Sequence, residues 1–186
     1  MNITDDILVF WFGDADVTQD CDARAAWFKV DPEFDAEIDN RFAQHARAAA
    51  DGAYDNWAET PPGSMALCIL LDQFPRNLHR GNANAFATDA KARQIASAAI
   101  EKGHDQEIAP AKRSFLYLPF MHSENIEDQI RSVELYRALG NESNFRYALE
   151  HHYVISRFGR FPTRNAALGR ETTPEEATFL QGFDAF

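Results

Sequence analysis

Residues 65–77 read MALCILLDQFPRN, and this stretch indicates the fold class. Its seven consecutive apolar residues, 65–71, fit either a buried strand or a buried helix. The larger apolar side chains recur at helical spacing, which favours the helix: Leu67, Leu70, Leu71 and Phe74. We expect this helix to begin after Thr60, with two prolines in its first turn, and to end at Pro75, because proline disrupts a helix interior.

Segments on both sides of this stretch carry the same periodicity and similar boundary signals. We expect helices over 5–12, 32–51, 92–102, 110–118, 124–139, 142–158 and 174–180. Their predicted N-terminal caps include Thr4, Asp31, Ser123 and Thr173. The helix over 142–158 is apolar on two sides, which is typical of a central helix. No segment shows a strong two-residue period, so the sequence predicts a single all-α domain over 1–186, built of antiparallel helix pairs.

The composition narrows the class of protein. The chain has 186 residues and a net charge of −11, which argues against non-specific binding to nucleic acid or to an anionic membrane. No apolar run approaches the length of a membrane span, and the N-terminus does not resemble a secretory signal. With only Cys21 and Cys68, we expect a cytoplasmic protein without disulfides. No metal site or cofactor is predicted, since the sequence has no HExxH motif, no GxSxG motif and no glycine-rich phosphate loop.

Charge is distributed unevenly along the chain. Residues 1–59 contain 14 acidic and four basic residues, which amounts to a charge of −10. By contrast, residues 151–170 contain four arginines and no acidic residue. Arginine presents a planar fork of donors that suits a carboxylate or a phosphate. The arginine segment therefore predicts either an anion site or ion pairs with the acidic third of the chain.

Three predicted turns carry polar residues that helix packing does not explain: 71–81, 118–124 and 157–170. The first and third resemble each other, since FPRN at 74–77 matches FPTRN at 161–165 with one inserted residue. If the two turns face one cleft, their arginines form a clamp with two forks around an anion. The predicted ligand-binding residues are Arg76, Asn77, Arg157, Arg160, Arg164 and Asn165. Alternatively, these side chains satisfy the open carbonyls at nearby helix ends.

Four further residues are candidates for acid–base chemistry: Asp72, His122, Glu124 and His151. Their spacing matches no known metal motif. His151 and His152 are adjacent in one helix and point about 100° apart, so they are poorly placed to share a metal. A histidine on an apolar row is commonly a hydrogen-bonded core residue, and this interpretation applies most clearly to His152.

Several motifs, in order along the chain, resemble one bacterial family. They are VFWFG at 9–13, WF at 27–28, LDQFPRN at 71–77, LPFMHSE at 118–124, RFGRFPTRN at 157–165 and LGRETTPEE at 168–176. They are similar to those of the domain of unknown function 924 (DUF924). The resemblance implies a right-handed helical array similar to tetratricopeptide-repeat (TPR) proteins, although no 34-residue repeat is visible. The family carries no established activity, and this chain has Thr163 where the family pattern usually has histidine.

The sequence is compatible with three functions. In the first, a cleft lined by Arg, Asn and His binds a small anionic molecule, and acid–base residues leave enzymatic activity open. In the second, the protein is a helical-repeat scaffold that binds a peptide or protein partner. In the third, all three polar turns are structural networks of caps and ion pairs. The sequence does not specify the ligand or the oligomeric state.

Overall fold

The protein is described by a computed structural model covering residues 2–182. These residues form helices joined by turns, and no residue between 2 and 182 lies in a strand, so the prediction of an all-α fold is confirmed. The α-helices are α1 (Ile3–Phe12), α2 (Pro32–Ala50), α3 (Pro61–Cys68), α4 (Phe74–Leu78), α5 (Asp89–Glu101), α6 (Pro110–Met121), α7 (Ile126–Leu139), α8 (Glu142–Phe158) and α9 (Pro174–Gln181).

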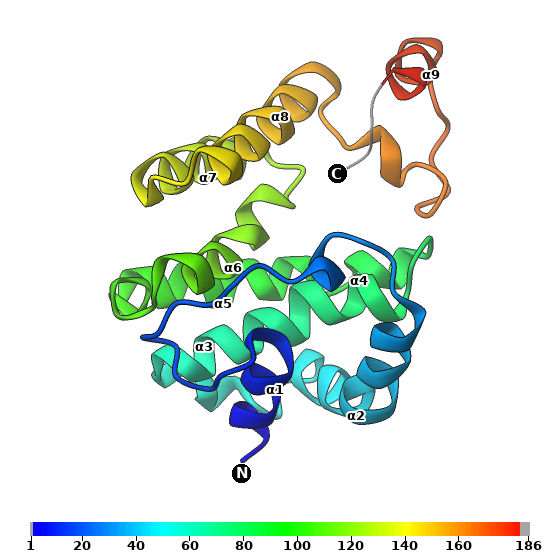
Figure 1. The fold of residues 1–186 in the computed structure, drawn as a ribbon. Helices are drawn as coiled ribbons and strands as arrows, with labels where there is room; N and C mark the ends of the chain where they lie inside the picture. Colours follow the sequence, from blue (N-terminus) through cyan, green and yellow to red (C-terminus); the bar gives the residue numbers. More distant parts are fainter. Residues whose placement is uncertain (1, 183–186) are drawn as a thin grey trace.

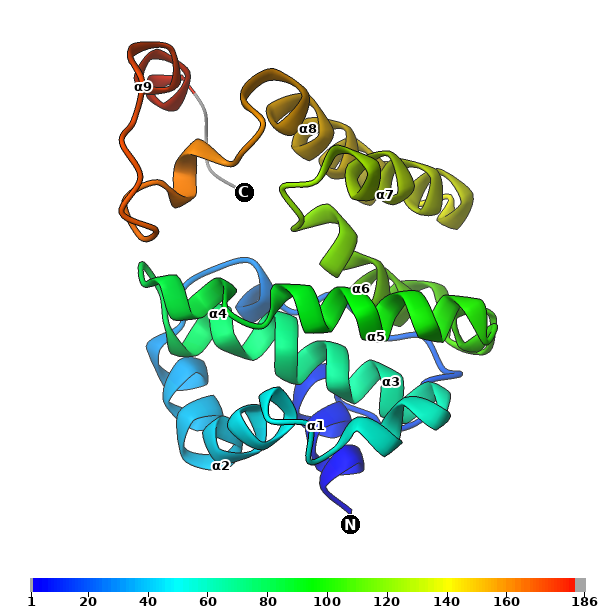
Figure 2. The same ribbon diagram turned by 180° about the vertical axis from the view of Figure 1, so that it is seen from behind.

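Figures 1 and 2 show that α1 to α5 form the broad base of the molecule. Helix α6 leads from this base to the α7/α8 pair, and the segment after α8 carries α9. The main hydrophobic core fills the base and extends to Tyr136 of α7 and Ala148 of α8. A second, small cluster contains Val154, Ile155 and Phe161. No helix within residues 2–182 is long and apolar enough to cross a membrane.

Local capping signals account for several helix ends. Asp31 accepts hydrogen bonds from the backbone N–H groups of Glu33 and Phe34, with Pro32 in the first turn of α2. Thr173 forms the predicted capping box at the start of α9. Two predicted caps are wrong. Helix α1 is capped by Asn2 in place of Thr4, and α7 by Asn125 in place of Ser123. In both cases a nearby side-chain oxygen reaches the same open N–H groups, so sequence position alone does not identify the cap.

Two prolines do not end helices as predicted. Pro75 lies inside α4, which follows a π-helical segment, Ile69–Gln73, without a break. Since Pro75 has no N–H group, the carbonyl of Leu71 lacks its usual partner four residues ahead, and the Thr88 hydroxyl donates to it instead. Of the turn predicted over 71–81, residues 71–78 are therefore helical.

Pro119 likewise lies inside α6, which continues to Met121. A proline inside a helix costs about 3 kcal/mol. Beyond it, Phe120 and Met121 are buried in the main core. Burial of each such side chain contributes roughly 1.5–3 kcal/mol, which is enough to offset the lost hydrogen bond.

Helix α8 is not the central helix that its sequence predicts. It packs against α7 and lies at the periphery of the molecule (Figure 1). One face is buried through Ala148, His151, Val154 and Ile155. On the opposite side Leu149 and Tyr153 retain 43% and 53% of their exposure. The second apolar row is thus a surface feature, which periodicity alone cannot distinguish from a core face.

Candidate functional site

The centre of the site is Asp72, a fully buried carboxylate directly after the apolar run 65–71. It lies in the π-helical segment Ile69–Gln73, where the N–H group of Phe74 donates to the carbonyl of Ile69, five residues earlier. Such π-turns are rare and frequently occur at functional sites. The apolar sequence of the helix thus carries a carboxylate into the interior, where it must find partners.

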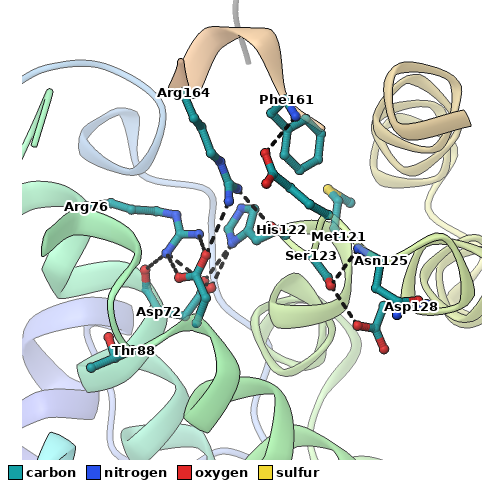
Figure 3. A network of polar contacts seen from close by, with 12 residues as sticks. Asp72, Arg76, Thr88, Met121, His122, Ser123, Asn125, Asp128, Phe161 and Arg164 are labelled. Carbon is teal, nitrogen blue, oxygen red and sulfur yellow. Dashed lines mark hydrogen bonds and ion pairs between the residues drawn. The ribbon is translucent and has the colours of Figure 1, made fainter. Parts of the chain in front are cut away.

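His122 is the partner that Asp72 finds on another helix, in addition to the adjacent Gln73, whose Nε2 donates to Oδ2 of Asp72. His122 caps the C-terminal end of α6, and its Nδ1 lies 2.8 Å from Oδ1 and 3.0 Å from Oδ2 of Asp72 (Figure 3). Arg76, one turn further along from Asp72, places Nη1 3.3 Å from Oδ1 of the same carboxylate. Burial acts to raise the pKa of Asp72, but the Arg76 charge and His122 outweigh it and hold that pKa at about 2.

His122 is held in one orientation with a lowered pKa. Burial and the positive charge of Arg76 lower the pKa of His122, although Asp72 acts in the opposite direction. A neutral His122 that donates from Nδ1 to Asp72 keeps its proton on that nitrogen and has a lone pair on Nε2. Its side chain retains 16% of its exposure. This arrangement of carboxylate and imidazole is the one that prepares a histidine to accept a proton.

Two arginines meet on a second carboxylate, Asp89, the first residue of α5. Arg76 contacts both of its oxygens, with Nη1 2.9 Å from Oδ1 and Nη2 3.0 Å from Oδ2. Arg164 comes from the 3-10 turn Pro162–Arg164, 75 residues away, and its Nη1 lies 3.4 Å from Oδ2. The two predicted arginine forks therefore converge, and the carboxylate between them belongs to the protein itself.

Arg164 is held between aromatic rings and the backbone of α6. Its guanidinium carbon lies 4.5 Å from the ring centroid of Phe86 and 4.6 Å from that of Phe161. Its Nη2 donates to the carbonyl of His122 at 2.8 Å, so it reaches down onto the Asp72–His122 pair, as Figure 3 shows. Burial and the nearby Arg76 lower the pKa of Arg164 to about 10, with Asp89 opposing them. Arg164 is thus a desolvated cation with limited charge compensation.

Glu124 lies next to this network and anchors the segment that carries Arg164. Its Oε1 accepts a hydrogen bond from the backbone N–H of Phe161 at 2.7 Å. Arg170 donates to both of its oxygens, at 2.7 and 2.9 Å. Burial acts to raise the pKa of Glu124, but the hydrogen bonds from Arg170 and Phe161 lower it overall. Glu124 therefore holds the segment after α8 in place, and its hydrogen bonds are to Phe161 and Arg170.

His151 lies beside the network on α8. Its ring centroid is 6.4 Å from that of His122 and 5.5 Å from that of Phe161. Its Nδ1 donates to the carbonyl of Tyr147 at 2.8 Å. Burial, followed by repulsion from the protonated form of His122, lowers the pKa of His151 to about 3, so the side chain is neutral at pH 7.

Arg160 and Asn165 belong to a separate cluster at the start of α9. Arg160 pairs with Glu176, with Nε 2.6 Å from Oε1 and Nη2 2.9 Å from Oε2. Asn165 is buried and donates to the same carboxylate at 3.2 Å. Glu176 also accepts from the N–H of Thr173 in the capping box. This cluster holds α9 against the preceding turn.

The remaining two predicted ligand-binding residues, an exposed arginine and a half-buried asparagine, have partners outside the network. Arg157 pairs with Glu175 at 3.0 Å on the surface. Asn77 donates to Asp35 of α2 at 2.7 Å and so links α4 to α2. Neither contacts Asp72, His122 or the two converging arginines.

Sequence reasoning missed three members of the network: Phe86, Asp89 and Arg170. An acidic residue in the first turn of a helix is common because it favours the helix dipole, so Asp89 carried no distinctive signal. Within residues 2–182, no three His, Cys, Asp or Glu side chains are grouped to hold a metal ion. Surface hollows of about 300 and 180 Å³ lie elsewhere, against Asp16 and against Arg47, respectively.

These features define an all-helical protein in which an Asp–His pair and two arginines meet at the junction of the base with the C-terminal segment. Residues 7–183 match the family of bacterial proteins of unknown function termed DUF924, and the chain belongs to that family. A solved structure of a protein of unknown function, ATU0120 from Agrobacterium tumefaciens, is similar, with 42% identity and a TM-score of 0.89. The match covers 97% of this chain and 98% of that one. No curated protein matches the chain.

Proposed function

We propose that this protein binds a small anionic molecule beside Arg164 and uses His122 as a general base. The observation that carries the proposal is the contact between His122 Nδ1 and the buried Asp72 carboxylate. This contact fixes the tautomer of His122, and the lowered pKa keeps the ring neutral and able to accept a proton. A cytoplasmic location, where thiols such as Cys21 and Cys68 stay free, belongs to the same proposal.

Arg76 and Arg164 supply the positive charge that such a reaction requires. The guanidinium group of Arg76 contacts Asp72 and that of Arg164 donates to the carbonyl of His122, so both are near enough to stabilise negative charge that develops on a bound molecule. The nearby candidates for a covalent nucleophile are poorly suited. Burial raises the pKa of the Cys68 thiol, and the Ser123 hydroxyl donates to Asp128. The chemistry that fits is proton abstraction from a bound anion or from water, without a covalent intermediate.

Nuclear magnetic resonance of the protein with ¹⁵N-labelled histidine side chains tests the protonation state of His122 directly. We expect His122 to carry its proton on Nδ1 at pH 7, and to titrate below its ordinary value of 6.5. His152, on the outer part of α8, is the matched control. A doubly protonated His122 at pH 7, or one protonated on Nε2, would exclude the general-base role.

A ligand screen tests the anion-binding part. Thermal melts of the wild type are compared with those of Arg164→Met and of Arg157→Met, in the presence of phosphate, nucleotides and small organic acids. We expect at least one anion to raise the melting temperature of the wild type and of the Arg157 variant, and to have no effect on the Arg164 variant. If no anion raises the wild-type value, or if the shift survives in Arg164→Met, the site does not bind anions.

A second function is favoured by the apolar surface of the α7/α8 pair. Ile126 and Ile130 on α7, and Leu149 and Tyr153 on α8, are exposed at helical spacing. In a helical array similar to TPR proteins, such a surface binds a helical peptide of a partner protein. Selection of displayed amphipathic peptides tests this, since binders should lose affinity for Leu149→Glu. Failure to select any peptide that depends on Leu149 would remove this alternative.

A further inference from the structure

The carboxylate of Asp89 occupies the position that the arginine clamp offers to a ligand. Each of its two oxygens accepts a hydrogen bond from one nitrogen of Arg76, at 2.9 and 3.0 Å. Arg164, from the turn after α8, contacts one of the same oxygens. Planar, two-oxygen anions match this fork geometry. The Asp89 side chain therefore indicates that the two arginines fit a carboxylate.

The two arginines hold Asp89 unequally. Arg76 makes two hydrogen bonds of ordinary length to it, whereas Arg164 has a single contact of 3.4 Å. Arg164 retains only 13% of its side-chain exposure, so this weak pairing leaves a nearly buried cation under-compensated. Its other recorded hydrogen bond is to the neutral carbonyl of His122. Of the two, Arg164 is the arginine that gains more from a second carboxylate.

Arg164 also lies on a segment that is separate from the base. Phe161 belongs to a small hydrophobic cluster with Val154 and Ile155, distinct from the main core. Near the site, this segment forms hydrogen bonds to the rest of the described chain at Asp89, His122 and Glu124. The Arg164–Asp89 contact, at 3.4 Å, is the longest of these, so it is the contact that a competing anion most readily replaces. Arg164 can therefore leave Asp89 while Glu124 keeps the segment in place.

We infer that Asp89 is an internal competitor, and that a ligand carboxylate takes its place on Arg164. This inference rests on the proposed function, and it names the ligand class as a carboxylic acid whose carboxylate pairs with Arg164 beside His122. Arg164 is then the residue that determines specificity, and Asp89 lowers the affinity of the resting protein for its ligand. In this scheme Arg76 stays paired with Asp89 throughout.

The test is to titrate malonate, acetate and inorganic phosphate into the wild type, Asp89→Asn and Asp35→Asn. Asp35 pairs with Arg80 away from the site and serves as the matched control. Removal of a competing charge should strengthen malonate binding by roughly tenfold in Asp89→Asn, while Asp35→Asn leaves it unchanged. A purely structural role for Asp89 has the opposite sign, because Arg76 would lose its position and binding would weaken.

A second measurement uses the wild type alone and is independent of how well Asp89→Asn folds. Malonate should shift the side-chain nitrogen resonances of Arg164, with Arg76 and the surface residue Arg157 nearly unchanged. Equal or weaker binding to Asp89→Asn with an unshifted Arg164 overturns this inference and leaves the proposed base intact. Tighter binding of phosphate than of malonate overturns the carboxylate class. No binding of any probe to either protein overturns both this inference and the anion-binding part of the proposed function.

Discussion

The Nδ1 atom of His122 lies 2.8 Å from Oδ1 of Asp72, although 50 residues separate the two in sequence. Asp72 lies in the π-helical segment of the helix in the middle of the base, and His122 caps α6. His122 reaches Asp72 because α6 continues past Pro119, the residue predicted to end it. The π-turn before Pro75 thus positions Asp72, and burial of the residues after Pro119 positions His122.

Replacement of Asp72 by Asn should destabilise the protein strongly. The variant removes a fully buried negative charge that compensates Arg76, and loss of one partner of a buried pair costs about 3 kcal/mol or more. Urea denaturation at pH 7 measures the free energy of unfolding. Asp35→Asn is the control and should change it by far less, since the Asp35–Arg80 pair is partly exposed. A near-zero effect for Asp72→Asn would contradict the described network.

Stability should fall as the pH is lowered from about 6.5 towards 4.5. The folded-state pKa of His151 is about 3, below its ordinary value of 6.5, so the unfolded chain binds a proton that the folded chain does not. The free energy of unfolding therefore decreases as the pH falls, by about 2 kcal/mol over this window for His151 alone. Denaturation of His151→Gln at several pH values should show a flatter profile than the wild type, and an unchanged slope would contradict the lowered pKa of His151.

Below pH 4 the carboxylates continue the loss of stability. The pKa of Asp72 is about 2 in the folded protein, below its ordinary value of 3.8, so its contribution is complete above pH 4 and is lost as the pH falls towards 2. Asp72→Asn should therefore lose less additional stability than the wild type between pH 4 and 2. Equal slopes for the two proteins in this range would show that Asp72 titrates normally.

Arg164→Met should lower the free energy of unfolding by about 2 kcal/mol. The methionine keeps an unbranched apolar stem between Phe86 and Phe161 but removes the donor to the His122 carbonyl. Arg157→Met, at an exposed pair, should change it by less than about 0.5 kcal/mol. Equal effects of the two substitutions would indicate that Arg164 contributes only surface charge.

Thr88→Val tests the hydrogen bond that replaces the one lost at Pro75. The variant keeps the shape of the side chain and removes the hydroxyl that donates to the Leu71 carbonyl, at a cost of about 1–3 kcal/mol for an unsatisfied buried acceptor. Thr178→Val is the matched control, because its hydroxyl donates to an exposed carbonyl at the start of α9. If both variants melt at the wild-type temperature, the Thr88 hydroxyl does not support the π-turn.

Sequence reasoning was most accurate where the relevant physics is local. The cap at Asp31, the capping box at Thr173 and the end of α8 at Gly159 each depend on side chains or dihedral angles within a few residues. It failed at Pro75 and Pro119, because the cost of a proline is weighed against burial of residues that follow it. Helix propensity alone does not include the free energy gained when the following residues are buried.

For the candidate site, the sequence by itself determined which residue types are available and which polar segments carry them: Asp72, Arg76, His122 and Arg164. Only the tertiary structure decided that these four meet, that Asp89 lies between the arginines, and that Arg160 and Arg157 pair elsewhere. The physical reason is that periodicity and caps are short-range properties. The partner of a buried charge is instead set by whichever distant helix the packed core places beside it.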